Sequence, residues 1–330
     1  MERKIRVAIL GMGGMGCTHA DQLLKMDDVE IVALCSTSDN AQKFNESRDI
    51  SIPVYHDFDR MLDELEIDAL YVSIPPYAHC GQIEKAAAKK IAIFTEKPLA
   101  LTVERSESIA AAVSENGVKS MMGYHMRFGG AVQYVKKLMD DGLTGKPTLY
   151  SAAYECNSLH SPWWIHKELC GGQIFEQVIH LYDMALYLMG PFDSVCGFVS
   201  NLCHQDVENY TVEDTSSVVI RFKSGALGNI IGSNCSIPNR WVGSFKVVFE
   251  NCVAEFADFN NVKLTWTKGE VREENLSFDT NVRWAENRLF IDVLKGNADE
   301  FASIHEGLIG VRIVDGAVRS SEANGMPIRF

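Results

Sequence analysis

The chain has 330 residues, enough for roughly two domains and a sizeable buried core. Its composition, with 46% hydrophobic and 23% charged residues, is ordinary for a globular protein. The formal net charge of −13 argues against a nucleic-acid partner and against an anionic membrane surface, because both favour a basic patch.

The nine cysteines lie scattered along the chain and form no Cys-x-x-Cys pair. Disulfide frameworks and structural zinc sites need clustered cysteines, so we expect reduced thiols and no metal. The apolar run Ile5–Leu10 is too short for a signal peptide, and no stretch approaches about 20 apolar residues. We therefore expect a cytoplasmic protein that does not span a membrane.

Strands alternate with helices from residue 5 to about residue 122. The expected strands are Ile5–Leu10, Glu30–Cys35, Asp68–Ile74 and Ala92–Thr95. The expected helices are Thr18–Met26, one that begins near Asp39, His79–Lys89 and Val103–Asn116. This alternation predicts an α/β domain with a doubly wound parallel sheet over residues 1–123.

The second part of the chain, residues 124–330, changes to a succession of strands. We expect strands at Leu149–Cys156, Val195–Ser200, Thr215–Phe222, Gly225–Ser233, Phe245–Glu250 and Val253–Phe256. The short turn Lys223–Gly225 is a hairpin signal, and strands linked by hairpins pair antiparallel. The pattern predicts an α+β domain with a large, open and mostly antiparallel sheet.

A glycine-rich motif, Gly11-Met12-Gly13-Gly14-Met15-Gly16, follows the first strand and opens a helix. In G-x-G-x-x-G the first glycine allows a tight turn, the second lets the backbone approach a pyrophosphate, and the third lets helix and strand pack closely. Helix N–H groups then face the phosphate charge. A plain glycine-rich turn would show the same letters, but the preceding strand and the following helix favour a dinucleotide-binding Rossmann domain.

The end of the second strand usually distinguishes NAD from NADP, through an acidic residue on the ribose or an arginine on a 2′-phosphate. Here Ser36 and Thr37 stand at that position, in place of an acidic residue or an arginine. We expect these hydroxyls to contact the cofactor, with NAD and NADP both open. Asp39 comes too late for the ribose and fits a helix N-cap better.

Three further motifs follow predicted strands or open a predicted helix. Ser73-Ile74-Pro75-Pro76, with His79, ends a buried strand where a dinucleotide crosses a parallel sheet. Thr95-Glu96-Lys97-Pro98-Leu99 ends the next strand, and we expect Glu96 and Lys97 to join the cofactor site. Gly171-Gly172-Gln173-Ile174-Phe175-Glu176-Gln177-Val178-Ile179-His180 opens a helix in the second domain.

With these motifs together, the chain resembles the glucose–fructose oxidoreductase, inositol dehydrogenase and MocA (Gfo/Idh/MocA) family. Its members share the glycine motif, a Glu-Lys-Pro after a strand, and Gly-Gly-x-x-x-Asp-x-x-x-His opening a helix in the second domain. The likeness extends to Gly123–Phe128 and to the tail from Phe290 to Ile328, and so covers essentially the whole chain. It implies an NAD(P)-dependent dehydrogenase that transfers a hydride between nicotinamide and a hydroxyl-bearing carbon of a sugar, cyclitol or glycoside.

Lys97 lies at the mouth of the predicted parallel sheet, where substrate and nicotinamide should meet. An ammonium group there can hydrogen-bond the reacting hydroxyl and stabilise alkoxide character as the hydride leaves. By position alone it could equally be a solvated lysine after a strand. The resemblance implies the catalytic role, and often a cis peptide bond before the following proline, here Pro98.

The helix after Gly172 carries two adjacent apolar rows and should be largely buried. Glu176, His180 and Asp183 share the remaining stripe at helical spacing. A histidine is suited to accept a hydroxyl proton near neutral pH, although a core histidine paired with Glu176 would show the same spacing. The resemblance implies that His180 is the catalytic base, and we expect Asp183 to be structural.

Glu176 departs from the family pattern, in which most members have Asp. The extra methylene moves the carboxylate outward by about 1.5 Å, so the substrate hydroxyl that it reaches is open. It could orient His180 or bind a sugar hydroxyl. Further candidates for substrate contacts are Tyr124, His125, Arg127, Asn157, His160, Trp163, His166 and Gln177.

In the expected mechanism, His180 takes the hydroxyl proton and Lys97 orients the oxygen, while the cofactor takes the hydride. A redox-neutral, NAD-using glycosidase would need nearly the same residues. A non-catalytic ligand sensor is disfavoured, because it needs no proton-transfer groups. Since relatives commonly pair through the open sheet, we expect a homodimer or homotetramer, with a small sugar or polyol as the other partner.

Overall fold

The computed structural model describes residues 3–330 and divides into two compact units. The first unit holds the described residues up to Gly123 together with the later segment Arg283–Leu308, and the second holds Tyr124–Val282 and Ile309–Phe330. Helix α9 (Val282–Leu294) explains the return of the chain to the first unit. Its Phe290 packs edge-on against Tyr71 and Phe94, each at a ring-centroid separation of 5.7 Å.

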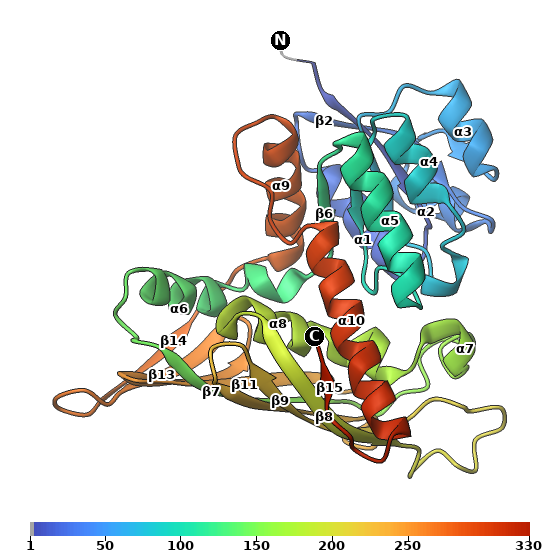
Figure 1. The fold of residues 1–330 in the computed structure, drawn as a ribbon. Helices are drawn as coiled ribbons and strands as arrows, with labels where there is room; N and C mark the ends of the chain where they lie inside the picture. The colour runs from blue at the N-terminus through green and yellow to red at the C-terminus, as the bar shows by residue number, and fades with distance from the viewer. Residues whose placement is uncertain (1–2) are drawn as a thin grey trace. The chain divides into compact units, whose positions relative to one another are not determined.

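Six parallel strands form the sheet of the first unit, in the order β3-β2-β1-β4-β5-β6 (Figure 1). The strands are β1 (Ile5–Leu10), β2 (Val29–Cys35), β3 (Val54–Tyr55), β4 (Ala69–Val72), β5 (Ala92–Thr95) and β6 (Ser120–Met122). The helices before Gly123 are α1 (Gly14–Leu23), α2 (Asn40–Arg48), α3 (Phe58–Glu64), α4 (Gln82–Ala88) and α5 (Val103–Asn116). The order runs outward from β1 in both directions, which confirms the doubly wound Rossmann topology.

The second unit contains a nine-stranded sheet in the order β14-β13-β12-β11-β7-β10-β9-β8-β15 (Figure 1). The strands are β7 (Pro147–Glu155), β8 (Phe192–Ser200), β9 (Thr215–Phe222), β10 (Leu227–Ser233), β11 (Val242–Phe249), β12 (Cys252–Asp258), β13 (Asn261–Trp266), β14 (Arg272–Ser277) and β15 (Ile328–Arg329). Neighbours are antiparallel except for β7 and β10, which are parallel. The mostly antiparallel sheet is confirmed, and the predicted turn joins β9 to β10 as a hairpin.

Helices cover one face of this large sheet. They are α6 (Gly130–Asp140), α7 (Lys167–Cys170), α8 (Ile179–Met189) and the later part of α10 (Ile304–Glu322). Figure 1 shows α8 lying over the sheet, and Tyr150 of β7 donates its hydroxyl hydrogen to the Leu181 carbonyl at 3.0 Å. The strand register places several apolar side chains on the opposite face, where they are between 40% and 57% exposed: Leu149, Phe198, Val219, Leu227 and Ile231.

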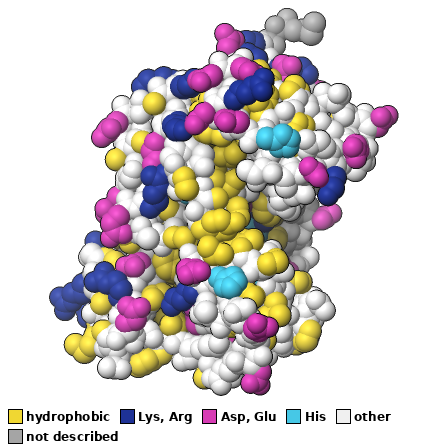
Figure 2. Space-filling model, turned by 90° about the vertical axis from the view of Figure 1, so that its right-hand side faces the viewer, with side chains coloured by type: hydrophobic (Ala, Val, Ile, Leu, Met, Phe, Trp, Pro, Cys, Tyr) yellow, Lys and Arg dark blue, Asp and Glu magenta, His cyan; other side chains and the backbone are white. Residues whose placement is uncertain are grey.

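The expectation that every cysteine would be reduced was wrong, because Cys203 and Cys235 form a disulfide. The two are 32 residues apart in the sequence, and the pairing of β9 with β10 brings their Cα atoms to 6.1 Å. Figure 2 shows acidic and basic side chains interspersed over the face that it draws, rather than a continuous basic stripe on that face. Among the described helices, none combines the length and the apolar composition needed to cross a membrane.

Candidate functional site

The glycine-rich turn after β1 is tightly packed on one side and open on the other. Gly11 has a φ of +92°, and a Cβ there would lie 2.5 Å from the Ser73 carbonyl oxygen. A Cβ on Gly16 would overlap the Gly11 carbonyl oxygen, whereas a Cβ on Gly13 or Gly14 would meet no atom within 4 Å. Gly11 and Gly16 therefore have to be glycine, because neighbouring backbone atoms leave no room for a side chain. Gly13 and Gly14 leave the backbone at the start of α1 accessible, as a phosphate-binding turn requires.

The end of β2 presents hydroxyl groups. The Ser36 hydroxyl oxygen lies 3.2 Å from that of Ser38, and Thr37 is exposed. His56 Nδ1 donates to the Ser36 carbonyl at 2.7 Å, which fixes the strand end. Asp39 does occupy the N-cap position of α2, but its side chain makes no capping hydrogen bond. Hydroxyls at this position suit either NAD or NADP.

The turns after β4 and β5 continue the hydrogen-bond ladder of the sheet. The Ser73 amide donates to the Leu10 carbonyl at 2.8 Å, and the Glu96 amide donates to the Val72 carbonyl at 2.9 Å. The expected cis peptide bond is present at Lys97–Pro98. The other cofactor-site candidates of this unit are buried or half-buried: Met12, Met15, Ile74, Pro75, Pro76 and His79.

A buried polar network surrounds the carboxylate of Glu96, the residue before Lys97. His19 of α1 contacts Glu96 Oε1 through Nε2 at 3.0 Å, and Asn287 Oδ1 through Nδ1 at 3.2 Å. The other carboxylate oxygen of Glu96 accepts the Lys97 amide at 3.3 Å. Space around this carboxylate is tight, since a Cβ on Gly123 would lie 2.8 Å from Glu96 Cδ. The network therefore ties the turn that carries Lys97 to α1 and to α9.

The pKa values of two carboxyl groups in this network are shifted in opposite directions. Arg283 Nη1 lies 3.5 Å from Glu96 Oε1 and 3.0 Å from Glu286 Oε1. Burial works to raise the pKa of Glu96, but the hydrogen bond with His19 and the charge of Arg283 outweigh it and bring the pKa down to about 2. Burial raises the pKa of Glu286 to about 7. Glu96 is thus ionised at neutral pH, while Glu286 retains a proton up to about neutrality.

In the second unit, the Gly171–Gly172 turn begins the helix that carries His180. Gly172 has a φ of +113°, and a Cβ there would overlap the carboxylate of Glu213. Glu213 Oε1 accepts the backbone N–H of Ile174 at 3.0 Å. Glu213 is buried, and this burial raises its pKa. It caps the first turn of the helix, which only a glycine at position 172 permits.

The first turn of this helix, Ile174–Val178, is π-helical, although the sequence predicted one regular α-helix. A π-helical turn contains more residues than an α-helical one, so the helical spacing between Glu176 and His180 differs from the regular α-helical spacing that the sequence suggested. π-bulges are frequent at functional sites. His180 is 6% exposed and Asp183 is buried, which confirms that the helix is largely buried.

Trp164 holds the carboxylate of Glu176. Its indole N–H donates to Glu176 Oε2 at 3.0 Å, and its ring is 1% exposed in a cluster with Cys170 and Tyr210. The longer side chain of Glu176, compared with Asp, therefore reaches a donor that the core fixes. The neighbouring Trp163, which the sequence suggested as a substrate contact, is half-buried and packs against the same cluster.

The structure brings Tyr124 and His125 close to His180. The ring of His180 lies 4.7 Å from that of His125, at an interplanar angle of 77°, and 6.4 Å from that of Tyr124. Arg127 is buried, and its Nη2 and Nε lie 2.6 Å and 3.0 Å from the carboxylate of Asp183. This pair fixes the short helix His125–Phe128 to α8, as expected of a structural Asp183.

The remaining substrate-contact candidates form polar contacts within the second unit. Gln177 Nε2 lies 2.5 Å from His160 Nε2, and Cys156 Sγ lies 3.3 Å from Gln177 Oε1. Asn157 donates its side-chain N–H to the Ser236 carbonyl at 3.3 Å. His166 is half-buried at the N-cap of α7, but its side chain makes no capping hydrogen bond.

Three supporting residues were missed from the sequence: His19, Trp164 and Glu213. The signal for His19 was a polar residue three positions after the last glycine of the motif. Trp164 belongs to the Pro-Trp-Trp segment, in which the sequence suggested a tryptophan as a cofactor or sugar contact, with Trp163 as the candidate. Glu213 has no local signal, because its partner Ile174 is 39 residues away.

Comparison with known proteins relates both units to one group of enzymes. The sequence model of the oxidoreductase family with an NAD-binding Rossmann fold (GFO_IDH_MocA) matches residues 5–124, and that of the GFO/IDH/MocA C-terminal domain matches residues 132–255. A scyllo-inositol 2-dehydrogenase (NAD(+)) of Bacillus subtilis (strain 168) is 32% identical over 240 residues, 72% of this chain and 69% of that protein.

Two further similarities bear on the chemistry and on the fold. A 2,7-anhydro-N-acetylneuraminate hydratase of Mediterraneibacter gnavus is 30% identical over 213 residues, 62% of this chain and 54% of that protein. The structure of a levoglucosan dehydrogenase in complex with NADH and levoglucosan has a TM-score of 0.89, covers 99% of both chains and is 18% identical. This structural likeness shows that the fold is shared.

Proposed function

Because the chain belongs to the Gfo/Idh/MocA oxidoreductase family, we propose that it is an NAD(P)-dependent dehydrogenase of a sugar or cyclitol. The reaction moves a hydride between nicotinamide and a hydroxyl-bearing carbon, with release or uptake of the hydroxyl proton. The observation that carries the proposal lies in the first sheet. The open glycine turn after β1 and the turn that carries Lys97 after β5 share one edge of the parallel sheet, with only β4 between them.

The first unit would hold the cofactor. The backbone N–H groups around Gly13 and Gly14 suit the pyrophosphate, and Ser36 and Thr37 suit a ribose hydroxyl. The cofactor, when bound, supplies the site that accepts or returns the hydride. The turn residues Ser73–Pro76 support this role, because they follow the strand between β1 and β5.

The substrate hydroxyl would be bound by Lys97 and His180. His180 accepts the hydroxyl proton, as a neutral imidazole can near pH 7. The ammonium of Lys97 donates a hydrogen bond to the same oxygen and stabilises its developing negative charge. Glu176, anchored by Trp164, positions His180 or binds an adjacent hydroxyl.

A hydroxyl-rich substrate fits the side chains that the second unit assembles. His125 lies beside His180, and Gln177, the residue after Glu176, forms a polar pair with His160. The relative from Bacillus subtilis is a scyllo-inositol 2-dehydrogenase, which makes inositols the first substrates to test. The donors and acceptors of these side chains match ring hydroxyls.

The direct test is turnover of inositols and sugars, with NAD and NADP each followed as the reduced form appears. Alanine at Lys97 or at His180 should lower turnover by at least about a hundredfold, in line with the loss of a general acid–base group. Alanine at Lys25, which is exposed, serves as the matched surface control and should have no effect. Near-normal turnover in both site variants with cofactor bound would rule out the assigned roles.

A second candidate function follows from the similarity to the hydratase. A hydratase adds water, so the overall oxidation level of its substrate does not change. In a redox-neutral variant of the present site, the same lysine and histidine would act while the cofactor returns to its starting state. Product formed from a glycoside without net appearance of reduced cofactor would favour this alternative.

We also propose that the protein is cytoplasmic and forms a homodimer or homotetramer through the open face of the second unit's sheet. Exposed apolar side chains such as Leu149, Val219 and Leu227 share that face and would be covered by a second copy. Asp at Val219 should dissociate the oligomer in analytical ultracentrifugation. An oligomer of unchanged size in that variant would contradict the interface.

A further inference from the structure

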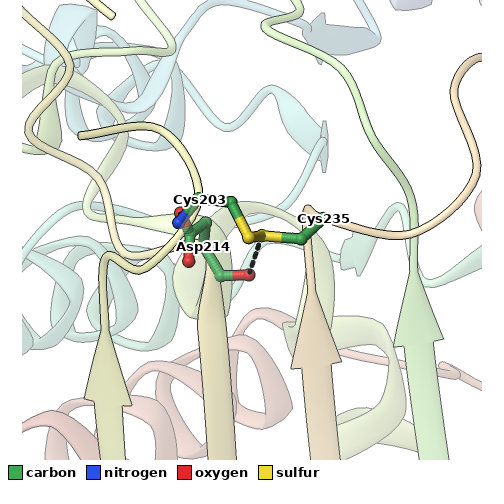
Figure 3. Close-up of side chains that lie close together, drawn as sticks. All are labelled: Cys203, Asp214 and Cys235. Carbon is green, nitrogen blue, oxygen red and sulfur yellow. Dashed lines mark hydrogen bonds between the residues drawn. A yellow bond between two sulfur atoms is a disulfide. The ribbon is translucent and has the colours of Figure 1, made fainter. Parts of the chain in front are cut away.

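A disulfide lies in the second unit and takes no part in the proposed chemistry. Cys203, in the loop before β9, is bonded to Cys235, which follows β10 (Figure 3). Cys203 is exposed and Cys235 is half-buried, so the pair lies near the surface of the second unit. Four other cysteines are buried, and burial raises the pKa of each to between about 11 and 12: Cys35, Cys156, Cys170 and Cys252. Those thiols are poor nucleophiles, because the thiolate is the reactive form.

Asp214 shapes the loop that carries the first cysteine. Its carboxylate accepts the backbone N–H groups of Leu202, Cys203 and His204 at 2.9 Å, 2.7 Å and 3.0 Å. Burial works to raise the pKa of Asp214, but these three donors outweigh it and lower the pKa. The Asp214 carbonyl oxygen lies 4.0 Å from Cys235 Sγ (Figure 3). The hydrogen bonds of the loop thus position Cys203 next to Cys235.

The same carboxylate also argues against a metal ion at this cluster. It accepts from the Thr215 hydroxyl at 3.0 Å and lies 3.2 Å from His204 Nδ1, in addition to the three amides. Five contacts occupy the lone-pair sites that a carboxylate offers, so little capacity is left for a cation. The chemistry of the cluster is therefore that of its two sulfur atoms.

Asn234 connects the disulfide to the substrate-side segment of the second unit. Its amide donates to the Asp214 carbonyl at 2.7 Å. Its side chain accepts the Ser158 amide at 3.0 Å and donates to the Ser158 carbonyl at 2.9 Å. Cys156 Sγ lies 3.1 Å from Asn234 Oδ1 and 3.3 Å from Gln177 Oε1. One continuous chain of contacts thus runs from the disulfide to a substrate-contact candidate.

A second connection runs through Glu213, the residue before Asp214. Glu213 caps the first turn of the helix that carries Glu176 and His180. The loop that the disulfide holds therefore supports both the capped helix and the segment around Asn157. Loosening the loop should loosen both.

We propose that Cys203 and Cys235 are a thiol–disulfide exchange site that reacts with low-molecular-weight thiols and disulfides, and that its oxidation state sets how firmly the substrate side of the second unit is held. Exposed disulfides are the labile class, which small thiols reduce more readily than buried ones. The effect on substrate rests on the proposed function, whereas the exchange itself does not.

The small thiols that attack the disulfide supply the electrons for its reduction. A thiolate attacks the sulfur of Cys203, the more exposed residue of the pair, the bond to Cys235 breaks, and Cys235 leaves as a thiolate that takes a proton from water. A second thiol then attacks the mixed disulfide and releases Cys203. The protein disulfide gains two electrons and two protons, and two small thiols are oxidised to one small disulfide.

The exchange is tested by counting free thiols in glutathione buffers of graded ratio, with alkylation and mass spectrometry. Oxidised buffer should leave two fewer free thiols than reduced buffer, and the lost pair should map to Cys203 and Cys235. Cys80, which is exposed elsewhere in the chain, is the matched control, and Cys80→Ser should leave the transition unchanged. No linkage in oxidised buffer, a linkage that survives excess reduced glutathione, or tight binding of added zinc would each overturn the proposal.

The link to the substrate side is tested by hydrogen exchange, which needs no turnover. Reduction, or the double variant Cys203→Ser/Cys235→Ser, should speed amide exchange at 156–160 and 174–178 and leave β1 unchanged. If the protein turns over an inositol, the same variant should raise KM severalfold. Equal exchange rates in both redox states would overturn the link, whereas absent turnover with altered exchange would count against the proposed function alone.

Discussion

Shortening Glu176 to Asp should disconnect its carboxylate from Trp164. The two atoms that hydrogen-bond are 3.0 Å apart, and removing a methylene withdraws the carboxylate by about 1.5 Å, beyond hydrogen-bond range. Trp164 is 1% exposed, so its N–H would gain no water in exchange. A buried donor left without a partner costs about 1–3 kcal/mol, and we expect Glu176→Asp to lower the free energy of unfolding by that amount.

A double-mutant cycle separates this hydrogen bond from the packing of the indole ring. Urea unfolding is measured for Glu176→Asp, Trp164→Phe and the double variant. Once the indole N–H is gone, shortening the Glu176 side chain leaves no buried donor without a partner. The double variant should therefore be about 1–2 kcal/mol more stable than the sum of the two single-variant losses predicts. The same cycle on Trp266 and Glu274, a partly exposed pair at 3.2 Å, should show a smaller coupling. Additivity at Trp164 within about 0.5 kcal/mol would refute the reasoning.

Two further substitutions test the supporting contacts. Glu286→Gln should flatten the pH dependence of stability. The pKa of Glu286 is about 7 in the folded protein, above the ordinary 4.5, so between these two values the unfolded chain releases a proton that the folded protein keeps. The free energy of unfolding therefore falls as pH rises from about 4.5 to about 7. The Tm between about pH 5 and 7.5 should therefore fall further in the wild type than in the variant, and parallel curves would contradict this. Gly172→Ala should cost more than the about 1–3 kcal/mol of backbone strain alone, because its Cβ also overlaps Glu213. Gly81→Ala, at a φ of +112° in open space, isolates the strain, and equal losses in the two variants would exclude the overlap.

Where a segment carries its own pattern, the sequence was sufficient to predict its structure. Ile5–Leu10 and Val103–Asn116 were predicted with the observed bounds, because one is a continuous apolar run and the other a regular amphipathic helix. The edge strand β14 was missed, since Arg272–Ser277 is mostly exposed and has no apolar pattern. The glycine motif could be recognised for the same reason as the first strand, because all of its residues lie together in the sequence.

Contacts between distant segments could not be predicted in this way. The bond between Trp164 and Glu176 depends on the path of a loop, and the capping of Ile174 by Glu213 depends on which strand follows that loop. The disulfide depends on the pairing of β9 with β10, so scattered cysteines gave a misleading impression of reduced thiols. The motif residues were predicted from the sequence as candidates, whereas the residues that contact them could be identified only from the fold.

The central claim is that Lys97 and His180 act on the same substrate oxygen, and a crystal structure of the protein with NADH and scyllo-inositol tests it most directly. The account predicts that Lys97 Nζ and a ring nitrogen of His180 both lie within about 3.2 Å of one inositol hydroxyl oxygen. A bound inositol whose hydroxyls contact only one of the two side chains, or neither, would contradict it.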